Sequence, residues 1–135
     1  MSKDIFFEKT SVAELKGSDF HDDKPWLLKS EKCSFVLFYA PWCGHCQNIK
    51  KDYKDFGDMC QFVKVCALNT EKEKKFVEKL NSTPKTKVKI VSFPTIWIYK
   101  NGEPFKEYKG ERTLAAFCKK AMEICNAKCN CDKNN

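Results

Sequence analysis

Two cysteines in the middle of the chain, Cys43 and Cys46, are separated only by a glycine and His45. The apolar run at residues 35–40 is rich in aromatic and β-branched side chains, which is typical of a buried strand, and it stops at Pro41. The residues that follow favour a helix, so we expect Cys43 at the helix N-terminus, where free backbone N–H groups and the helix dipole favour a thiolate. Two cysteines at this spacing in a first turn approach closely enough to form a disulfide. The spacing therefore predicts a redox pair in which one sulfur attacks and the other resolves.

The heptapeptide at residues 40–46, Ala-Pro-Trp-Cys-Gly-His-Cys, resembles the active-site motif of protein disulfide isomerase catalytic domains, a branch of the thioredoxin superfamily. A bare Cys-x-x-Cys also occurs in zinc sites, but the whole heptapeptide after a buried strand is much more specific. The resemblance covers roughly residues 12–127 and implies an α/β thioredoxin fold, three layers α/β/α with a central mixed β-sheet. It also implies a thiol-disulfide oxidoreductase that forms, reduces or rearranges disulfides in protein substrates, with Cys43 as nucleophile and Cys46 as resolving thiol.

The resemblance extends to residues around the redox pair. Histidine side chains can carry a positive charge near neutral pH, so His45 is expected to stabilise the reduced, thiolate form and make the disulfide a better oxidant. Phe93 and Pro94 resemble the family's cis-proline loop, which faces the redox pair and binds peptide as an added strand. Trp42 is expected to contact apolar substrate side chains, and Arg112 matches the arginine that swings toward the resolving cysteine. The alternatives are an ordinary exposed histidine, a trans proline that begins a strand, a tryptophan packed in the core and a surface arginine.

One departure from the family pattern is Leu37, six residues before Cys43. The family usually carries a buried Asp or Glu at this position, which helps take the proton from the resolving thiol. Lys64 matches the lysine that pairs with that acid, so it has lost its partner. Because an unpaired buried ammonium is costly, we expect Lys64 to extend to water rather than lose its proton and act as a base. Mixed disulfides are then expected to be released more slowly than in the family.

Seven further cysteines are Cys33, Cys60, Cys66, Cys118, Cys125, Cys129 and Cys131. The first three lie in or beside predicted elements, and we expect buried, inert thiols for at least two of them. Cys118 and Cys125 are seven apart on one face of the predicted last helix. The cysteines at 125–131 are compatible with a second disulfide, a relay to the main site or a thiolate metal site. No histidine stands near them, so we expect a structural or regulatory disulfide and no metal.

The composition indicates one globular domain. The chain has 135 residues, of which 42% are hydrophobic and 13% aromatic, enough for a core that needs no disulfides. We expect a single thioredoxin domain at residues 1–135, with a core at about 12–127 and a cysteine-rich tail at 128–135. The net charge of +7 comes from lysines spread along the chain and no nucleic-acid motif is present, so nucleic-acid binding is not expected. No apolar run reaches membrane-spanning length, so we expect no membrane segment.

Strands alternate with helices along the first part of the chain, which favours parallel pairing. The predicted strands are residues 12–15, 34–39, 62–68, 95–99 and 104–108, and the predicted helices are about 19–28, 43–59, 70–80 and 113–127. Pro25 shortens or breaks the first of these helices. Asn101 and Gly102 predict a tight hairpin turn between the last two strands.

The two ends of the chain predict the cellular compartment of the protein. Residues 1–9 lack the uninterrupted apolar core of a secretion signal, and the last residues lack an endoplasmic reticulum retention tetrapeptide. We therefore expect a cytoplasmic protein by default. The alternatives are the lumen of the endoplasmic reticulum and a virus particle, since large DNA viruses carry compact thiol oxidoreductases.

No flavin or nicotinamide motif is present, so we expect no cofactor. Electrons would then come from or pass to glutathione, a reductase or an oxidase. The alternative to an enzyme is a non-catalytic module that keeps the fold and holds peptides in a groove around Trp42 and Pro94. The intact cysteine pair argues against this reading, whereas Leu37 slightly favours it.

Overall fold

The strand predicted before the cysteine pair is β2, Ser34–Tyr39, and all of its residues are buried. The computed structural model describes residues 6–130 and places β2 in the middle of a five-stranded sheet of order β1-β4-β2-β5-β6. The other strands are β1 Ala13–Leu15, β4 Lys64–Asn69, β5 Thr95–Lys100 and β6 Glu103–Tyr108. β4 pairs parallel with both β1 and β2, whereas β5 pairs antiparallel with β2 and β6. The predicted mixed sheet is confirmed.

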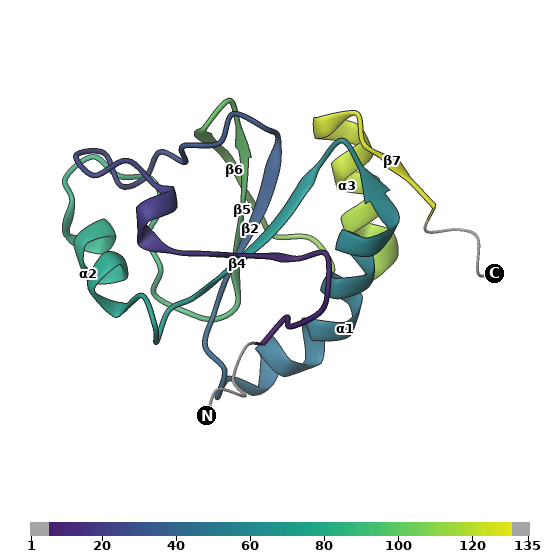
Figure 1. Ribbon diagram of the computed structural model, residues 1–135, viewed down its shortest axis with the longest axis horizontal. Helices are drawn as coiled ribbons and strands as arrows, with labels where there is room; N and C mark the ends of the chain where they lie inside the picture. The colour runs from purple at the N-terminus through teal and green to yellow at the C-terminus, as the bar shows by residue number, and fades with distance from the viewer. Residues whose placement is uncertain (1–5, 131–135) are drawn as a thin grey trace.

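Side chains alternate between the two faces of β2, as a pleated strand requires. Phe35, Leu37 and Tyr39 belong to one core cluster, which they share with residues of α1 (Gly44–Met59) and α3 (Leu114–Cys125). Val36 and Phe38 belong to the other cluster, on the side of α2 (Lys74–Ser82). Figure 1 shows α1 and α3 together on one side of the sheet and α2 on the other. The predicted three-layer α/β/α arrangement is therefore confirmed.

The helix expected at residues 19–28 is absent, and that prediction was wrong. Only a short 3-10 helix, Gly17–Asp19, forms there, and an isolated bridge joins Phe20 to Leu28. Pro25 lies inside the segment, and a proline removes a backbone donor and clashes with the preceding helical turn. The segment therefore loops back on itself and contributes the side chains of Phe20 and Leu28 to the core.

The hairpin between β5 and β6 turns at the two predicted residues. Asn101 has φ 54° and Gly102 has φ 81°, the two positive values that a tight hairpin turn of this kind needs. A Cβ atom at Gly102 would lie 2.5 Å from the carbonyl oxygen of Leu28. A glycine is required here both for the backbone angle and for the close contact with the preceding segment.

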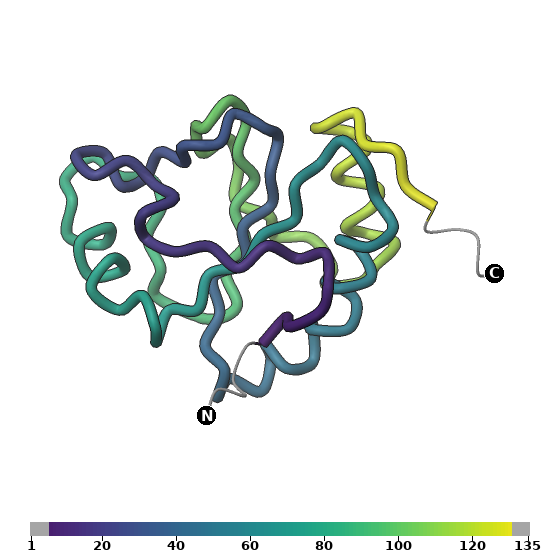
Figure 2. The backbone as a smooth tube through the Cα atoms, viewed as in Figure 1, coloured from purple at the N-terminus to yellow at the C-terminus, as the bar shows by residue number. Residues whose placement is uncertain are grey.

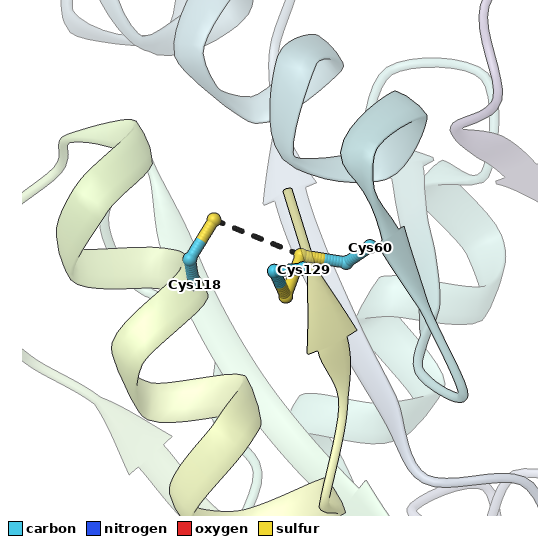
Figure 3. Close-up of side chains that lie close together, drawn as sticks. All are labelled: Cys60, Cys118 and Cys129. Atoms are coloured by element: carbon cyan, nitrogen blue, oxygen red, sulfur yellow. Dashed lines mark hydrogen bonds between the residues drawn. A yellow bond between two sulfur atoms is a disulfide. The ribbon is translucent and has the colours of Figure 1, made fainter. Parts of the chain in front are cut away.

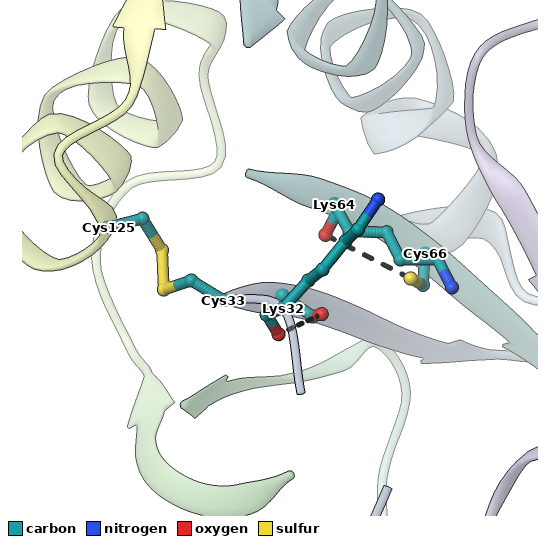
Figure 4. Close-up of a disulfide and its surroundings, with 6 residues drawn as sticks. Lys32, Cys33, Lys64, Cys66 and Cys125 are labelled. Atoms are coloured by element: carbon teal, nitrogen blue, oxygen red, sulfur yellow. Dashed lines mark hydrogen bonds between the residues drawn. A yellow bond between two sulfur atoms is a disulfide. The ribbon is translucent and has the colours of Figure 1, made fainter. Parts of the chain in front are cut away.

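Within residues 6–130, two disulfides tie the C-terminal part of the chain to its centre. One joins Cys33 to Cys125 (Figure 4), and the other joins Cys60 to Cys129. The expectation of free, inert thiols at two of the central positions was wrong, because Cys33 and Cys60 are bonded and only Cys66 of the three is a buried free thiol.

The expectation of a disulfide near the C-terminus is confirmed for the described residues, and Cys131 lies outside them. The Cys60–Cys129 bond joins two short strands, β3 (Cys60–Gln61) and β7 (Lys128–Cys129), which pair antiparallel. The tube in Figure 2 shows the C-terminal segment running back beside the end of α1. Within residues 6–130, no helix is both long and apolar enough to cross a membrane.

Candidate active site

Cys43 is the N-cap residue of α1, as its position after the central strand predicted. Its backbone is extended, with φ −79° and ψ 120°, and the helix begins at the next residue. The backbone N–H of Cys46 donates a hydrogen bond to Cys43 Sγ at 3.2 Å. A sulfur at this position therefore faces a backbone donor and the positive end of the helix dipole, both of which favour negative charge.

The two thiols of the pair differ in burial. Cys43 is 7% exposed, whereas Cys46 is completely buried beneath it. Burial, together with the hydrogen bond to Cys43, raises the pKa of the Cys46 thiol to about 12, while the Arg112 guanidinium acts in the opposite direction. Cys43 is thus the more accessible sulfur of the pair, and the raised pKa of Cys46 favours its protonated form at neutral pH.

The Phe93–Pro94 peptide bond is cis, as expected from the resemblance. The Cys43 thiol lies 3.7 Å from the carbonyl oxygen of Phe93, so the loop and the redox pair are in contact. The ring of Trp42 meets the ring of Phe93 edge to face, with centroids 5.8 Å apart. Trp42 is 64% exposed, and its indole N–H donates to the Glu71 carboxylate at 2.7 Å. Glu71 was not singled out from the sequence, because only the fold brings it beside Trp42.

The charged residues expected at the site are both exposed. His45 occupies the first turn of α1 between the two cysteines. Arg112 lines a hollow of about 210 Å³ together with Pro94, Thr95 and Tyr108. The structure thus brings Arg112 to the cis-proline loop and within electrostatic reach of Cys46.

Leu37 is fully buried, and its neighbours across the sheet are Ala67 and Ile96. Lys64 pairs in register with Ser34 instead, so it lies three residues, or about 10 Å, along the strand from Leu37. Lys64 is half-buried and lines a hollow at the open end of β4 with Lys32 and Val63. This position agrees with the expectation that the Lys64 side chain extends toward water.

A polar pair that the sequence did not reveal lies on the same face of β2 as Leu37. The Tyr39 hydroxyl donates to the Glu14 carboxylate at 2.7 Å, and the backbone N–H of Phe7 donates to the same group at 3.2 Å. Burial raises the pKa of Glu14, although these hydrogen bonds act to lower it. Burial also raises the pKa of Tyr39, and its hydrogen bond to Glu14 and the negative charge of that carboxylate add to that effect. The only signal in the sequence was an acidic residue inside an otherwise apolar edge strand.

Residues 11–123 match the Thioredoxin family, and the chain belongs to it. Among its curated relatives, protein disulfide-isomerase A6 of Homo sapiens is 31% identical over 121 residues, which are 86% of this chain and 25% of that protein. Protein disulfide-isomerase of Gallus gallus is 33% identical over 129 residues, which are 91% of this chain and 22% of that protein. The chain spans about a quarter of the length of the curated relatives it matches.

Solved structures share the same fold. The Trx4 domain of ERdj5 is 16% identical with a TM-score of 0.62, and the match covers 84% of this chain and 95% of that one. Human ERp44 in its form I is 16% identical with a TM-score of 0.65, and the match covers 84% of this chain and 29% of that one. These structural similarities support the thioredoxin fold that the strand order of the sheet indicates.

Proposed function

We propose that the chain is a thiol-disulfide oxidoreductase of the protein disulfide isomerase type, with Cys43 and Cys46 as its redox pair. The observation that carries the proposal is the position of Cys43 Sγ at the N-terminus of α1, 3.2 Å from the Cys46 N–H. A helix end that favours a thiolate and a second sulfur within the same turn are what thiol–disulfide exchange needs. The relatives named protein disulfide-isomerase support this assignment.

In the reducing direction, the Cys43 thiolate attacks one sulfur of a substrate disulfide. A new bond forms between Cys43 and that sulfur, and the other substrate sulfur leaves as a thiolate that takes up a proton. Cys46 then gives its proton to a base and attacks the Cys43 sulfur; the bond between Cys43 and the substrate breaks, and the second substrate sulfur leaves as a thiolate that takes up that proton. The pair ends as a disulfide and the substrate has gained two electrons; in the oxidising direction the same steps run in reverse.

The substrate in this proposal is an extended peptide segment of a protein that carries a thiol or a disulfide. The Phe93 carbonyl lies beside Cys43 and offers a backbone acceptor, while the exposed face of Trp42 offers apolar contact. Arg112 acts from the side of the cis-proline loop by favouring the thiolate of Cys46 during resolution. Glutathione or a second dithiol protein exchanges electrons with the pair, since no cofactor is expected.

Cytoplasmic residence, the default expectation from the sequence, gains no support from the relatives. We propose instead an oxidising compartment such as the lumen of the endoplasmic reticulum, because disulfides form and persist there. The Cys33–Cys125 and Cys60–Cys129 bonds support this location. Thiol alkylation in the native cells followed by mass spectrometry would find both pairs oxidised, whereas labelling of all four cysteines would contradict the proposal.

Insulin reduction by a small dithiol tests the function. We expect the wild type to accelerate precipitation of the insulin chains and Cys43→Ser to fall to the rate of the dithiol alone. Serine keeps an oxygen that accepts from the Cys46 N–H, so the helix cap survives the change. Cys66→Ala, which removes a free thiol from the opposite face of the sheet, is the matched control and should retain activity. Equal rates for wild type and Cys43→Ser would contradict the proposed activity and favour the alternative function, a non-catalytic module that binds peptides.

A further inference from the structure

A second group of sulfurs lies where α1 ends. Cys60 is the C-cap residue of α1 and begins β3, Cys118 lies on α3, and Cys129 lies on β7. Figure 3 shows the three side chains pointing toward one another. Their sulfur atoms all lie within 4.8 Å of each other, and Cys118 Sγ is 3.6 Å from Cys60 Sγ. Three elements from distant parts of the sequence therefore converge on one cluster.

We propose that this cluster becomes a binding site for a thiophilic divalent cation, Zn²⁺, when its disulfide is reduced. Thiolate sulfur is a preferred ligand of Zn²⁺, and three protein ligands plus one water or added thiol complete a tetrahedral shell. The site is separate from the redox pair, because Cys43 and Cys60 cap opposite ends of the 16-residue helix α1. The proposal does not depend on the proposed function.

The spacing of the sulfurs fits this ion. Zn–S bonds of about 2.3 Å in a tetrahedral shell place two sulfurs about 3.8 Å apart. Cys60 and Cys118 are already 3.6 Å apart. Cys129 must move from bonding distance of Cys60 to a similar separation, which a cysteine side chain achieves by rotating about its Cα–Cβ bond. The backbone elements that carry the three residues can stay in place.

The environment of the three sulfurs favours thiolates that bind a cation over thiolates without one. Cys60 is 8% exposed and Cys118 is 2% exposed, so uncompensated negative sulfurs would be poorly solvated there. The carbonyl end of α1 is the negative end of the helix dipole, which opposes a thiolate but stabilises a cation.

The chemistry balances with a dithiol as reductant. The dithiol gives two electrons and two protons to the Cys60–Cys129 bond and itself becomes a disulfide, which leaves two protein thiols. Under the same reductant Cys118 is also a thiol, whatever bond it makes in the oxidised chain. Zn²⁺ then binds three thiolates and releases three protons, so binding weakens as the pH falls. Oxidation of the cluster expels the ion.

The sequence did not favour a metal, because its three closely spaced cysteines at 125–131 have no histidine nearby. The structure selects a different set, with only Cys129 from that segment. Cys60 and Cys118 come from elements that are far apart in the chain and meet only in the folded protein.

The test uses the full chain in a Cys43→Ser/Cys46→Ser background, which removes the redox pair as a competing zinc site. The protein is reduced, the reductant is removed without air, and Zn²⁺ is titrated against a chromophoric chelator. Co²⁺ in place of Zn²⁺ reports sulfur ligation by its charge-transfer absorption. We expect one bound ion per chain. Cys118→Ser should lose at least the roughly 100-fold in affinity that replacing an outer-shell partner can cost, because it removes a direct ligand.

Cys33→Ser/Cys125→Ser is the matched control, because it removes two other thiols of the reduced chain and should leave affinity unchanged. Reduction also destabilises the fold, so thermal unfolding is a second readout: Zn²⁺ should raise the midpoint of the reduced parent and not that of reduced Cys118→Ser. No zinc bound by the reduced parent, or equal binding by parent and Cys118→Ser, would overturn the proposal.

Discussion

The two ends of α1 carry the same residue type in opposite environments. At the N-terminal end, Cys43 is a free thiol that faces a backbone N–H and lies beside an exposed tryptophan. At the C-terminal end, Cys60 is bonded to Cys129, and the backbone groups that face it are carbonyls. The direction of the helix thus favours a thiolate at its N-terminal end and disfavours one at its C-terminal end.

The distance between the two ends keeps their chemistry apart. A helix of 16 residues is about 24 Å long, so sulfur atoms at its two ends cannot exchange disulfides within one molecule. The relay considered from the sequence would therefore need a second molecule or a small thiol as carrier.

Cys46→Ser should abolish multiple turnover while leaving the first attack intact. Cys43 still opens a substrate disulfide, but no second sulfur is present to release the substrate. Non-reducing electrophoresis after acid quenching should show a stable mixed disulfide with insulin. Cys118→Ser, on α3 beside the C-terminal end of α1, is the control and should turn over within about twofold of the wild type. Normal turnover in Cys46→Ser would remove the distinction between attacking and resolving thiols.

Cys60→Ser/Cys129→Ser should destabilise the chain without changing the redox pair. The bond closes a loop with a sequence separation of 69 residues, and opening such a loop lowers the free energy of unfolding by about 4 kcal/mol. Urea unfolding followed by circular dichroism measures this loss. Insulin reduction, measured where the variant remains folded, should be unchanged, and a large loss of activity there would mean that the two ends are coupled.

Resolution of a mixed disulfide should accelerate with pH. Burial raises the pKa of Cys46 well above its ordinary value, so through the neutral range its thiolate fraction rises about tenfold per pH unit. Single-turnover release of glutathione from a Cys43–glutathione adduct, followed from about pH 6 to about pH 9, measures this slope. A flat profile would mean that an internal base accepts the proton, and Glu14 with Tyr39 would then be the first groups to replace.

Cys43→Ala should cost about 1 kcal/mol of stability relative to Cys43→Ser, because only serine restores an acceptor for the Cys46 N–H. Parallel urea titrations of the two variants measure the difference. Both variants lack activity, so the comparison isolates the capping role of the side chain. Equal stability would mean that the hydrogen bond to Cys43 Sγ contributes little to the start of α1.

The sequence alone was sufficient to predict those elements whose structure is determined by residues close together in the chain. The apolar run of β2, the cysteine pair at the start of α1 and the hairpin at Asn101 and Gly102 all lie within a few residues of each other. Their propensities and backbone requirements agree with the final fold, so pattern and spacing predicted them, and with them the α/β class. The expected helix at residues 19–28 failed because Pro25 outweighed a weak apolar pattern.

Only the tertiary structure decided the contacts between distant segments. The disulfides join residues 92 and 69 positions apart, and the connectivity of nine cysteines cannot be deduced from their spacing. The Glu14–Tyr39 pair and the sulfur cluster around Cys118 likewise arise from packing between elements. Local propensity determines which elements form, whereas the burial of apolar faces determines which of their side chains meet.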